Sequence, residues 1–435
     1  MLKYLCLGGY IVDELKNIII IGSRALTGFV FVFSAYCLFI SLFGFHKKKE
    51  VSSVKPKKRF ALIVAAHNEE TVISDIVLSL KGLDYPKEMY DTFVIADNCT
   101  DNTADKARKN GALVYERFNN DKRGKGYALE WMFKKLFKMK KKYDAVVIFD
   151  ADNIICKDFL NAMNKKLCEG YKVVQGYLDS KNPNDTWITG SYSISFWANN
   201  RMFQHSRDNL GISSQLGGTG CCIDIKMLEK LGWGATCLTE DLEFTCKLVS
   251  NGYKVGFAYD AVVYDEKPLT LVQSWKQRKR WMQGYADVSE RYFFRLLKKG
   301  IKERNFTAID CAIYTIQPVL FILMGISTVI GIGKLLLNSY NYLFGTNIVV
   351  GSSNTGVFTT MTGVLAIIMY LYTPFLLLLD KKFNLKILIY YIILPVYAIT
   401  WLPISIQGIL NRKNKEWSHT LHTRSVDIKD FEKAN

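Results

Sequence analysis

The chain carries two aspartates one residue apart, Asp150 and Asp152, directly after a buried run that predicts a strand, Asp144–Phe149. If the backbone stays extended there, both carboxylates point to the same side. Two such groups suit a hard divalent cation that also holds a diphosphate, so the pair implies Mg²⁺ or Mn²⁺. An acidic turn that binds nothing is the alternative, because a single aspartate pair is weak evidence.

Two further polar residues, Asp97 and Lys125, follow the same logic. Asp97 ends the run Asp91–Ala96, which predicts a neighbouring strand, so its carboxylate could face the same pocket. Lys125 lies between two glycines and offers a flexible cation to a phosphate. A solvent-exposed turn is an equally ordinary interpretation of the segment around Lys125.

A carboxylate that could act as a general base, Asp241, comes directly after Thr239 and Glu240. Thr239 predicts the N-cap of a helix that runs to about Asn251, with both acidic residues in its first turn. The helix dipole and the free backbone N–H groups would lower the pKa of Asp241, whereas burial and the neighbouring acids would raise it. The sequence leaves the balance between these effects open.

Gln277, Arg280 and Trp281 lie on a run from Leu269 to about Leu297 that predicts an amphipathic helix. Gln277 and Trp281 are four residues apart and share a face, with Arg280 beside them. An amide, a guanidinium and an indole together suit a phosphate and a sugar ring. The alternative is a membrane-interface helix that only binds anionic lipid through its basic side, which carries Lys276, Arg278 and Lys279.

These residues need a scaffold that brings distant parts of the chain together, and residues 59–268 predict one. Buried runs alternate with helical runs, which indicates a mostly parallel sheet covered by helices. Polar residues follow the predicted strands, whose carboxyl ends are where open α/β sheets bind ligands. The predicted strands are Phe60–Ala66, Asp91–Ala96, Ala112–Tyr115 and Asp144–Phe149, and the predicted helices are Thr71–Lys81, Tyr127–Lys138 and about Gly190–Arg207. A glycine-rich turn, Leu216–Gly220, precedes the helix after Thr239.

Four apolar runs predict membrane helices, because each is long enough to span a bilayer. They are Ala25–Phe45, Ile313–Leu337, Val357–Leu379 and Leu385–Leu410, and residues 1–24 predict a short interfacial helix. The first run lacks an A-x-A site, so we expect no cleavable signal. Basic residues directly follow it and mark a cytoplasmic flank: Lys47, Lys48, Lys49, Lys55, Lys57, Lys58 and Arg59.

Composition excludes two other classes of protein. The formal net charge of +17 over 435 residues does not indicate nucleic-acid binding, since the basic residues cluster beside apolar segments and no nucleic-acid motif accompanies them. The ten cysteines are scattered without a C-x-x-C pair, so we expect reduced thiols in a cytosolic environment rather than a disulfide framework.

Together these segments are more specific than any one of them. In order and in flanking elements they resemble membrane-integrated family 2 glycosyltransferases, the group that contains cellulose, hyaluronan and poly-N-acetylglucosamine synthases, over roughly residues 60–297. The matching features are Asn68-Glu69-Glu70, Asp97, Asp150-Ala151-Asp152, Gly218-Thr219-Gly220, Thr239-Glu240-Asp241 and Gln277-x-x-Arg280-Trp281.

The resemblance implies roles on the donor side. Asp97 would hold the uracil and ribose side of UDP with Lys125 nearby, and Asp150 and Asp152 would bind UDP and the metal. Arg280 would neutralise the diphosphate. Asp241, with Glu240 and Thr239, would supply the base that deprotonates the acceptor hydroxyl.

It also implies roles on the acceptor side. Trp281 would stack on the acceptor sugar, with the remaining motif residues, Gln277, Gly218, Thr219 and Gly220, also on that side. In the tail, Trp417, Thr420 and His422 resemble a gating segment that closes over UDP, although the cellulose-synthase pattern has a lysine where this chain has His422.

The implied protein is a multi-pass enzyme of the plasma membrane with a cytosolic GT-A-type α/β domain inserted between transmembrane and interfacial helices. It would transfer a sugar from a UDP-sugar to a growing β-linked polysaccharide, with inversion and a divalent metal, and UDP-N-acetylglucosamine is the first donor to test. Ceramide glucosyltransferases carry a similar motif set, so a glycolipid is the alternative product, and a non-enzymatic carbohydrate-binding scaffold is a further alternative. Secretion or accessory subunits stay open.

The expected divisions are residues 1–58 (N-terminal helices and basic flank), 59–268 (catalytic domain), 269–306 (amphipathic helices), 307–410 (C-terminal membrane region) and 411–435 (tail). Counting the three C-terminal runs as one crossing each places the tail opposite the catalytic domain. The basic residues Arg412, Lys413 and Lys415 indicate a cytosolic tail instead. Leu385–Leu410 is too short to cross twice at about 1.5 Å per residue, but Pro395 and Pro403 suit a broken, re-entrant segment, so we predict that it does not span fully.

Overall fold

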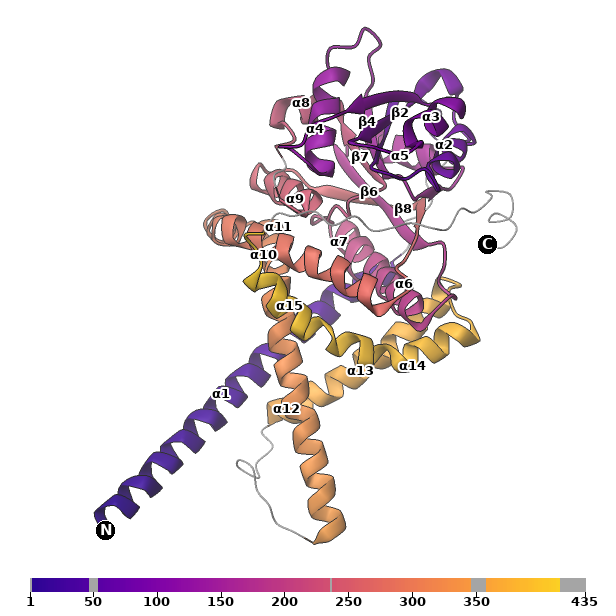
Figure 1. Cartoon of the computed structure of the whole chain (residues 1–435). Helices are drawn as coiled ribbons and strands as arrows, with labels where there is room; N and C mark the ends of the chain where they lie inside the picture. The colour runs from indigo at the N-terminus through magenta and orange to yellow at the C-terminus, as the bar shows by residue number, and fades with distance from the viewer. Residues whose placement is uncertain (1, 47–53, 235–236, 346–356, 415–435) are drawn as a thin grey trace.

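The computed structural model describes residues 2–46, 54–234, 237–345 and 357–414 (Figure 1). An α/β unit forms one end of the molecule, and the helices that precede and follow it in the sequence lie at the other end (Figure 1). Within the described residues the unit is built on an eight-stranded sheet with the order β3-β2-β1-β4-β7-β6-β8-β5. The strands are β1 (Phe60–Ala66), β2 (Tyr90–Asp97), β3 (Leu113–Arg117), β4 (Ala145–Asp150), β5 (Ile154–Ile155), β6 (Val173–Ser180), β7 (Cys221–Asp224) and β8 (Val255–Asp265).

The expected α/β class is confirmed, and β1 to β4 match the four predicted strands within two residues at each end. They pair in parallel, and successive residues of β1 face opposite sides of the sheet. Phe60, Leu62 and Val64 belong to one hydrophobic core, whereas Ala61 and Ile63 belong to the other. Strands buried on both faces read as continuous apolar runs, which is why they are visible in the sequence.

The second half of the sheet is mixed, and the sequence did not predict it. β7 is four residues long and runs antiparallel to both β4 and β6. β6 pairs in parallel with β8, and their register shifts between Gly176 and Tyr177. A short strand and an irregular register both weaken the period-2 pattern on which strand prediction depends.

Helices cover both faces of the sheet. They are α2 (Ile73–Lys81), α3 (Thr103–Lys109), α4 (Lys125–Leu136), α5 (Phe159–Cys168), α8 (Ile225–Leu231) and α9 (Glu240–Ser250). The predicted helix near 190–207 is divided into α6 (Trp187–Asn199), a π-helical turn (Asn200–His205) and α7 (Ser206–Asn209). The π turn carries Arg201, whose guanidinium pairs with Asp380 after the third apolar helix.

The predicted amphipathic helix is α10 (Leu271–Lys302), and α11 (Phe306–Thr315) follows it. One expected feature of α10 is wrong: Arg278 is not on a solvent-facing basic side but is completely buried. Its Nη1 donates to Thr400 Oγ1 at 2.8 Å, and its guanidinium lies over the rings of Tyr397 and Trp401. Helices from the C-terminal region cover this face of α10, which the sequence of α10 itself does not reveal.

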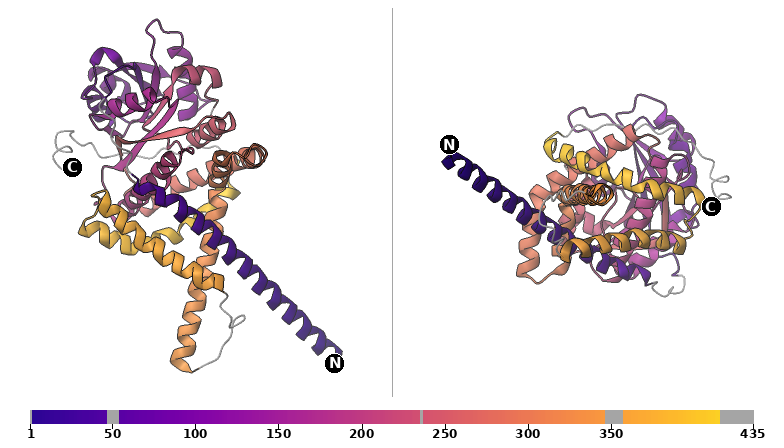
Figure 2. Two further views of the ribbon diagram at one scale, coloured as in Figure 1. Left: turned by 180° about the vertical axis from the view of Figure 1, so that it is seen from behind. Right: turned by 90° about the horizontal axis from the view of Figure 1, so that it is seen from below.

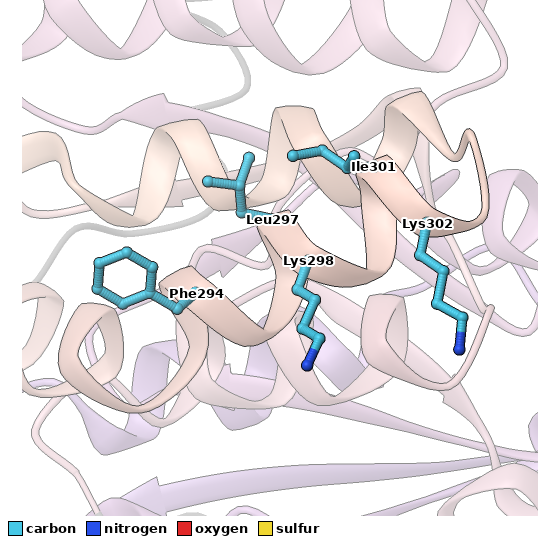
Figure 3. A pocket seen from close by; sticks show the side chains of 5 residues that line it. All are labelled: Phe294, Leu297, Lys298, Ile301 and Lys302. Carbon is cyan, nitrogen blue, oxygen red and sulfur yellow. The ribbon is translucent and has the colours of Figure 1, made fainter.

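Near its end α10 presents the mixture of side chains expected at a membrane surface. Phe294 and Ile301 are largely exposed, and Lys298 and Lys302 lie beside them around a shallow cavity (Figure 3). Exposed apolar side chains beside lysines suit the boundary between lipid headgroups and acyl chains. The interfacial placement of α10 stays a prediction.

Four helical segments among the described residues are long and apolar enough to span a membrane: Asn17–Phe45, Gln317–Phe344, Met361–Leu379 and Leu385–Leu410. The first belongs to α1 (Leu2–Leu42), a single helix where a short interfacial helix and a separate spanning helix were predicted. No proline interrupts residues 1–42, so nothing in the sequence breaks the helix. The second and third are α12 (Gln317–Phe344) and α13 (Val357–Leu379).

The fourth segment consists of two helices, α14 (Leu385–Ile399) and α15 (Trp401–Leu410). Seen from below, α12 is viewed nearly end-on, whereas the yellow α14 and α15 lie across the view beneath the α/β unit (Figure 2). Both ends of the segment contact that unit or α10. Before α14, Lys382 Nζ donates to Asp179 Oδ2 of β6 at 2.6 Å, and after α15, Gln283 Nε2 of α10 donates to the Asn411 carbonyl at 3.0 Å.

Candidate active site

The carboxyl ends of β1, β2 and β4 meet at one edge of the sheet, and the predicted donor-side residues collect there. Two strand spacings, about 10 Å, separate the strand that ends at Asp97 from the one that ends at Asp150. The motif Asn68-Glu69-Glu70 braces this edge: Asn68 Oδ1 accepts from Thr100 N, and Glu70 Oε2 accepts from Asn102 N. The loops after β1 and β2 are thereby held to each other.

Asp97 is buried and hydrogen-bonded by a residue that sequence reasoning missed, Arg117. The Arg117 guanidinium pairs with the Asp97 carboxylate, and its Nη2 donates to the Lys122 carbonyl at 2.6 Å. Burial raises the pKa of Asp97 above its usual value, although Arg117 opposes the shift. β2 and β3 place the two residues directly opposite each other, and this register is what brings them together.

The backbone turns at residues 151–152 instead of staying extended. The Asp150 side chain is 41 % exposed and pairs with Lys125. Asp152 is 5 % exposed, and its Oδ2 accepts from the Glu266 backbone N–H at 2.9 Å. The extended backbone on which the expectation of two parallel carboxylates depended is therefore wrong, whereas both aspartates lie close enough to the Asp265 carboxyl to raise its pKa.

Lys125, the first residue of α4, joins three parts of the site. It pairs with the Asp150 carboxylate, and its Nζ donates to the Gly218 carbonyl at 2.7 Å. Burial alone would lower the pKa of Lys125, but the carboxylates of Asp150 and Glu240 raise it above its usual range. The lysine is thus held in its charged form between the acidic turn and the glycine-rich turn.

The glycine-rich turn is fixed by a buried network that sequence reasoning did not find. Gln175 Nε2 donates to the Thr219 carbonyl at 2.9 Å, and Gln175 Oε1 accepts from Gly217 N at 2.9 Å. The Thr219 hydroxyl contacts Asn153 Oδ1 and accepts from Asp150 N at 3.1 Å. Thr219 is 3 % exposed, and its hydroxyl positions the acidic turn, whereas Gly220, also buried, leads into β7.

Asp241 lies in the first turn of α9, as predicted, and its carboxylate faces the glycine-rich turn at Gly218. A Cβ placed on Gly218 would lie 3.5 Å from Asp241 Oδ2, so the two residues are close neighbours. Gly218 also has a φ of +82°, a backbone conformation that glycine adopts without strain. Burial, and then the neighbouring Glu240 carboxylate, raise the pKa of Asp241 to about 7. The Leu242 N–H, which donates to Asp241 Oδ1 at 2.8 Å, opposes this shift but does not outweigh it.

Two details of this turn differ from expectation. Thr239 precedes α9, but its side chain forms no capping hydrogen bond. Instead, the Thr239 side chain packs against Gly284 of α10 so closely that any side chain at position 284 would collide with it. Glu240 also has a raised pKa through burial, opposed by Lys125, so the two acidic residues of the turn together favour binding a proton.

Gln277, Arg280 and Trp281 lie on α10. Burial lowers the pKa of Arg280, while Glu240 and Asp150 act in the opposite direction, which places its guanidinium near those carboxylates. Gln277 Oε1 accepts from the Tyr192 hydroxyl at 2.8 Å, and the Trp281 ring lies 6.0 Å from that of Tyr192. The predicted common face of Gln277 and Trp281 thus packs against α6.

Trp417, Thr420 and His422, the predicted gating segment, lie outside the described residues. The cavity of Figure 3 lies along α10 near its end and is lined by none of the carboxylates above. Among the described residues no group of three or more histidine, cysteine, aspartate or glutamate side chains is arranged to hold a metal by itself.

Comparison with known proteins gives a consistent picture. Residues 56–284 match the family described as "Glycosyltransferase like family 2". The chain is 28 % identical over 261 residues to a probable glycosyltransferase, YdaM, of Bacillus subtilis, covering 57 % of this chain and 61 % of the relative. It is 30 % identical over 242 residues to a β-monoglucosyldiacylglycerol synthase of Synechocystis, covering 54 % and 49 %. It is 26 % identical over 261 residues to a poly-β-1,6-N-acetyl-D-glucosamine synthase of Staphylococcus aureus, covering 59 % and 61 %.

The chain thus spans about half to three fifths of the length of these curated relatives. Among solved structures, the mannosyltransferase PcManGT from Pyrobaculum calidifontis, determined with GDP-Man and Mn²⁺, superposes with a TM-score of 0.60 at 17 % identity. That match covers 90 % of this chain and 97 % of the mannosyltransferase, so the common fold extends beyond the α/β unit into the apolar helices.

Proposed function

This chain belongs to family 2 of the glycosyltransferases and has their GT-A-type fold, and we propose that it transfers a sugar with inversion from a UDP-sugar to a hydroxyl group presented at the membrane surface. Membership of this family makes it an enzyme that uses nucleotide sugars, so a non-enzymatic scaffold no longer applies. The observation that carries the proposal is the continuous set Asp241–Gly218–Lys125–Asp150. The Asp241 carboxylate, whose pKa is raised, lies against the turn at Gly218. The Gly218 carbonyl accepts from Lys125, which also pairs with Asp150 on the donor side.

The base follows from the chemistry of the residues. An acceptor oxygen must lose its proton as it attacks, and Asp241 has a pKa near neutrality, which suits proton transfer at physiological pH. Burial keeps water from solvating the carboxylate and so maintains this pKa. One carboxylate base is enough for inversion, since no covalent nucleophile is required.

The diphosphate would lie between cations and the acidic turn. Lys125 and Arg280 carry positive charge to the two sides of this turn, and charge-assisted hydrogen bonds to phosphate oxygens are strong. Asp97, held by Arg117, would receive the nucleoside. These assignments are proposals that rest on where the side chains lie.

A divalent cation fits the acidic turn. Asp150 has an exposed carboxylate, and Asp152 supplies a second carboxylate two residues further on, whose Oδ2 is held by the Glu266 backbone N–H. Mg²⁺ and Mn²⁺ accept one or two protein carboxylates when substrate phosphates supply further oxygens, so a third protein ligand is not needed. Bound there, the cation would neutralise charge that develops on the leaving diphosphate.

Nucleotide release from the purified full-length protein tests the proposal. The panel contains UDP-N-acetylglucosamine and UDP-glucose, with GDP-mannose as the competing class because the structural neighbour was determined with it. We expect release from a UDP-sugar that requires Mg²⁺ or Mn²⁺ and is lost in the Asp241→Asn variant. Release from GDP-mannose alone would overturn the UDP assignment, and full activity in excess chelator would overturn the metal.

Two acceptor classes fit this site equally well so far. The relatives named above make either a polysaccharide or a glucosyldiacylglycerol, and a base at Asp241 would serve a sugar hydroxyl or a lipid hydroxyl alike. The sequence favours the polysaccharide.

A further inference from the structure

The acceptor side of the candidate site has a floor made by α14. Leu394 and Tyr397 of α14 belong to the same aromatic and apolar cluster as Trp281 and Tyr192. The rings of Tyr192 and Tyr397 lie 5.8 Å apart, and a Cβ at Gly190 of α6 would collide with the ring of Tyr390. The face of Trp281 that is proposed to meet the acceptor is therefore backed by a membrane-region helix.

This floor is fixed to α10 along its length. The buried Arg278 donates to Thr400, at the junction of α14 and α15, and stacks on rings from both helices. Further along, Trp275 Nε1 donates to Gln407 Oε1 at 2.9 Å, and α15 packs so closely that a Cβ at Gly408 would collide with Met282. Side chains thus fill the space below the site.

The remaining apolar helices do not enclose a conduit beside that floor. Few residues are buried in the apolar stretches of these helices: 17 % in α1, 6 % in α12 and 17 % in α13, within the described residues. Figures 1 and 2 show α1 and α12 diverging from each other away from the α/β unit. α13 packs against the end of α1, where the Tyr372 hydroxyl donates to the Ser41 carbonyl at 3.2 Å. A polysaccharide crossing a bilayer must have its hydroxyl groups hydrogen-bonded along the way, and apolar helices with so few buried residues offer no such path.

The opposite face of α14 is open and apolar. Four residues spaced three or four apart are about half or more exposed: Ile389, Ile392, Val396 and Ile399. α14 thus presents aromatic side chains to the site on one face and a lipid-compatible surface on the other. A molecule that lies along this outer face reaches the level of Trp281 without crossing the membrane.

From this arrangement we propose that the acceptor is the headgroup hydroxyl of a membrane lipid, which enters from the bilayer along α14, and that the product is a glycolipid. The proposal rests on the transferase function above and adds the acceptor class. The lipid oxygen loses its proton to Asp241 and forms a bond to the anomeric carbon of the sugar. The bond from that carbon to the diphosphate breaks, and UDP leaves with the electron pair.

Product analysis with the full chain in nanodiscs separates this proposal from its rival. Diacylglycerol in phosphatidylcholine is the lipid probe, a soluble β-linked tetrasaccharide is the sugar probe, and the donor sugar is radiolabelled. We expect diacylglycerol to raise nucleotide release at least tenfold and the label to enter the organic phase as a lipid bearing sugar. Stimulation by the tetrasaccharide, label in an aqueous polymer, or release that responds to neither probe would overturn the lipid acceptor.

These outcomes are distinct from failure of the transferase function, which would appear as no nucleotide release from any donor. A second experiment uses the outer face of α14. Ile392→Lys places a charge on that face, whereas the matched control Leu78→Lys places one on an exposed apolar position of α2 in the α/β unit. We expect Ile392→Lys to raise KM for diacylglycerol at least fivefold with unchanged KM for the donor, and Leu78→Lys to change neither; equal lipid KM in both variants would contradict entry along α14.

Discussion

Replacing Asp241 by asparagine removes the proposed base and keeps the size of the side chain. We expect kcat to fall by about 10²–10⁴, the usual contribution of a positioned general base, which corresponds to about 3–5 kcal/mol of transition-state stabilisation. Donor affinity should change by no more than a few-fold, since the donor-side contacts of Lys125 and Asp150 do not involve Asp241. Initial rates of nucleotide release and a donor titration measure both quantities.

The pH dependence gives an independent reading of the same residue. Because Asp241 must be ionised to accept a proton and its pKa is raised to about 7, kcat/KM should fall about tenfold per pH unit below pH 7. Replacing Glu240 by glutamine removes a negative neighbour that contributes to the raised pKa. The acidic limb of the profile should then move to lower pH.

Stability should respond in the opposite direction to activity. The folded protein binds the Asp241 proton more tightly than the unfolded chain, so between pH 3.8 and about 7 the folded state carries more protons, and stability falls as pH rises through that window. A shift of about 3 pKa units at 1.36 kcal/mol per unit costs at most about 4 kcal/mol above pH 7. An asparagine cannot ionise, so the variant should melt at a higher temperature than the parent at pH 8 and at a similar temperature at pH 4.

A thermal melt in detergent at both pH values, run beside the rate profile, therefore distinguishes a missing base from a misfolded protein. Near-normal turnover of Asp241→Asn would refute the assignment of the base. A rate profile that stays flat from pH 5 to 8 in the parent would refute the raised pKa even if the variant were inactive.

Four other expectations follow from the site and its surroundings. Asp152→Ala should lose the divalent dependence of UDP affinity, because a hard cation loses one of few protein oxygens, and unchanged Mg²⁺ titration curves would contradict this. Trp281→Ala should weaken acceptor use more than UDP affinity, because an indole offers a stacking face to an acceptor but little to a diphosphate; separate KM values for donor and acceptor decide it. Thr219→Val should lower thermal stability by about 1–3 kcal/mol and reduce turnover, since Asp150 N and Asn153 lose a buried partner, whereas Thr219→Ser should retain both. With the native cysteines removed, a cysteine at Ser353 should react with an impermeant thiol reagent on intact cells and one at Ser418 should not; both positions lie outside the described residues, and labelling at Ser418 would place the tail outside the cell.

The sequence by itself determined the local elements and the identity of the chemical groups. β1, β2 and β4 are buried on both faces, so their apolar runs are visible without any partner, and the polar residues that follow them mark the ligand-binding edge. Asp97 and Asp150 were found in this way, Asp241 was found by its place in the first turn of a predicted helix, and the apolar lengths of α12 and α13 were found by counting. Each of these features depends on residues close together in the chain.

Tertiary structure decided everything that depends on contacts between distant residues. The Glu266 partner of Asp152, the hydrogen bond between Gln175 and Thr219, and the Arg117 partner of Asp97 arise from pairings 20 to 114 residues apart. The raised pKa of Asp241 also depends on tertiary structure. Burial raises this pKa and the backbone N–H groups at the helix start lower it, and only the packed structure determines which effect is larger.

The clearest case is the segment Leu385–Leu410. Its length and hydropathy equal those of a spanning helix, and its two prolines indicate only that it can break. Whether it crosses the membrane or lies beneath the site depends on what its ends and faces meet. The structure supplies these partners, Asp179 for Lys382, Gln283 for Asn411, and Thr400 for the buried Arg278. Hydropathy measures how much a segment gains by leaving water, and both a bilayer and an aromatic protein surface provide that gain, so hydropathy alone does not tell them apart. That the segment does not span fully stays a prediction, which these contacts support.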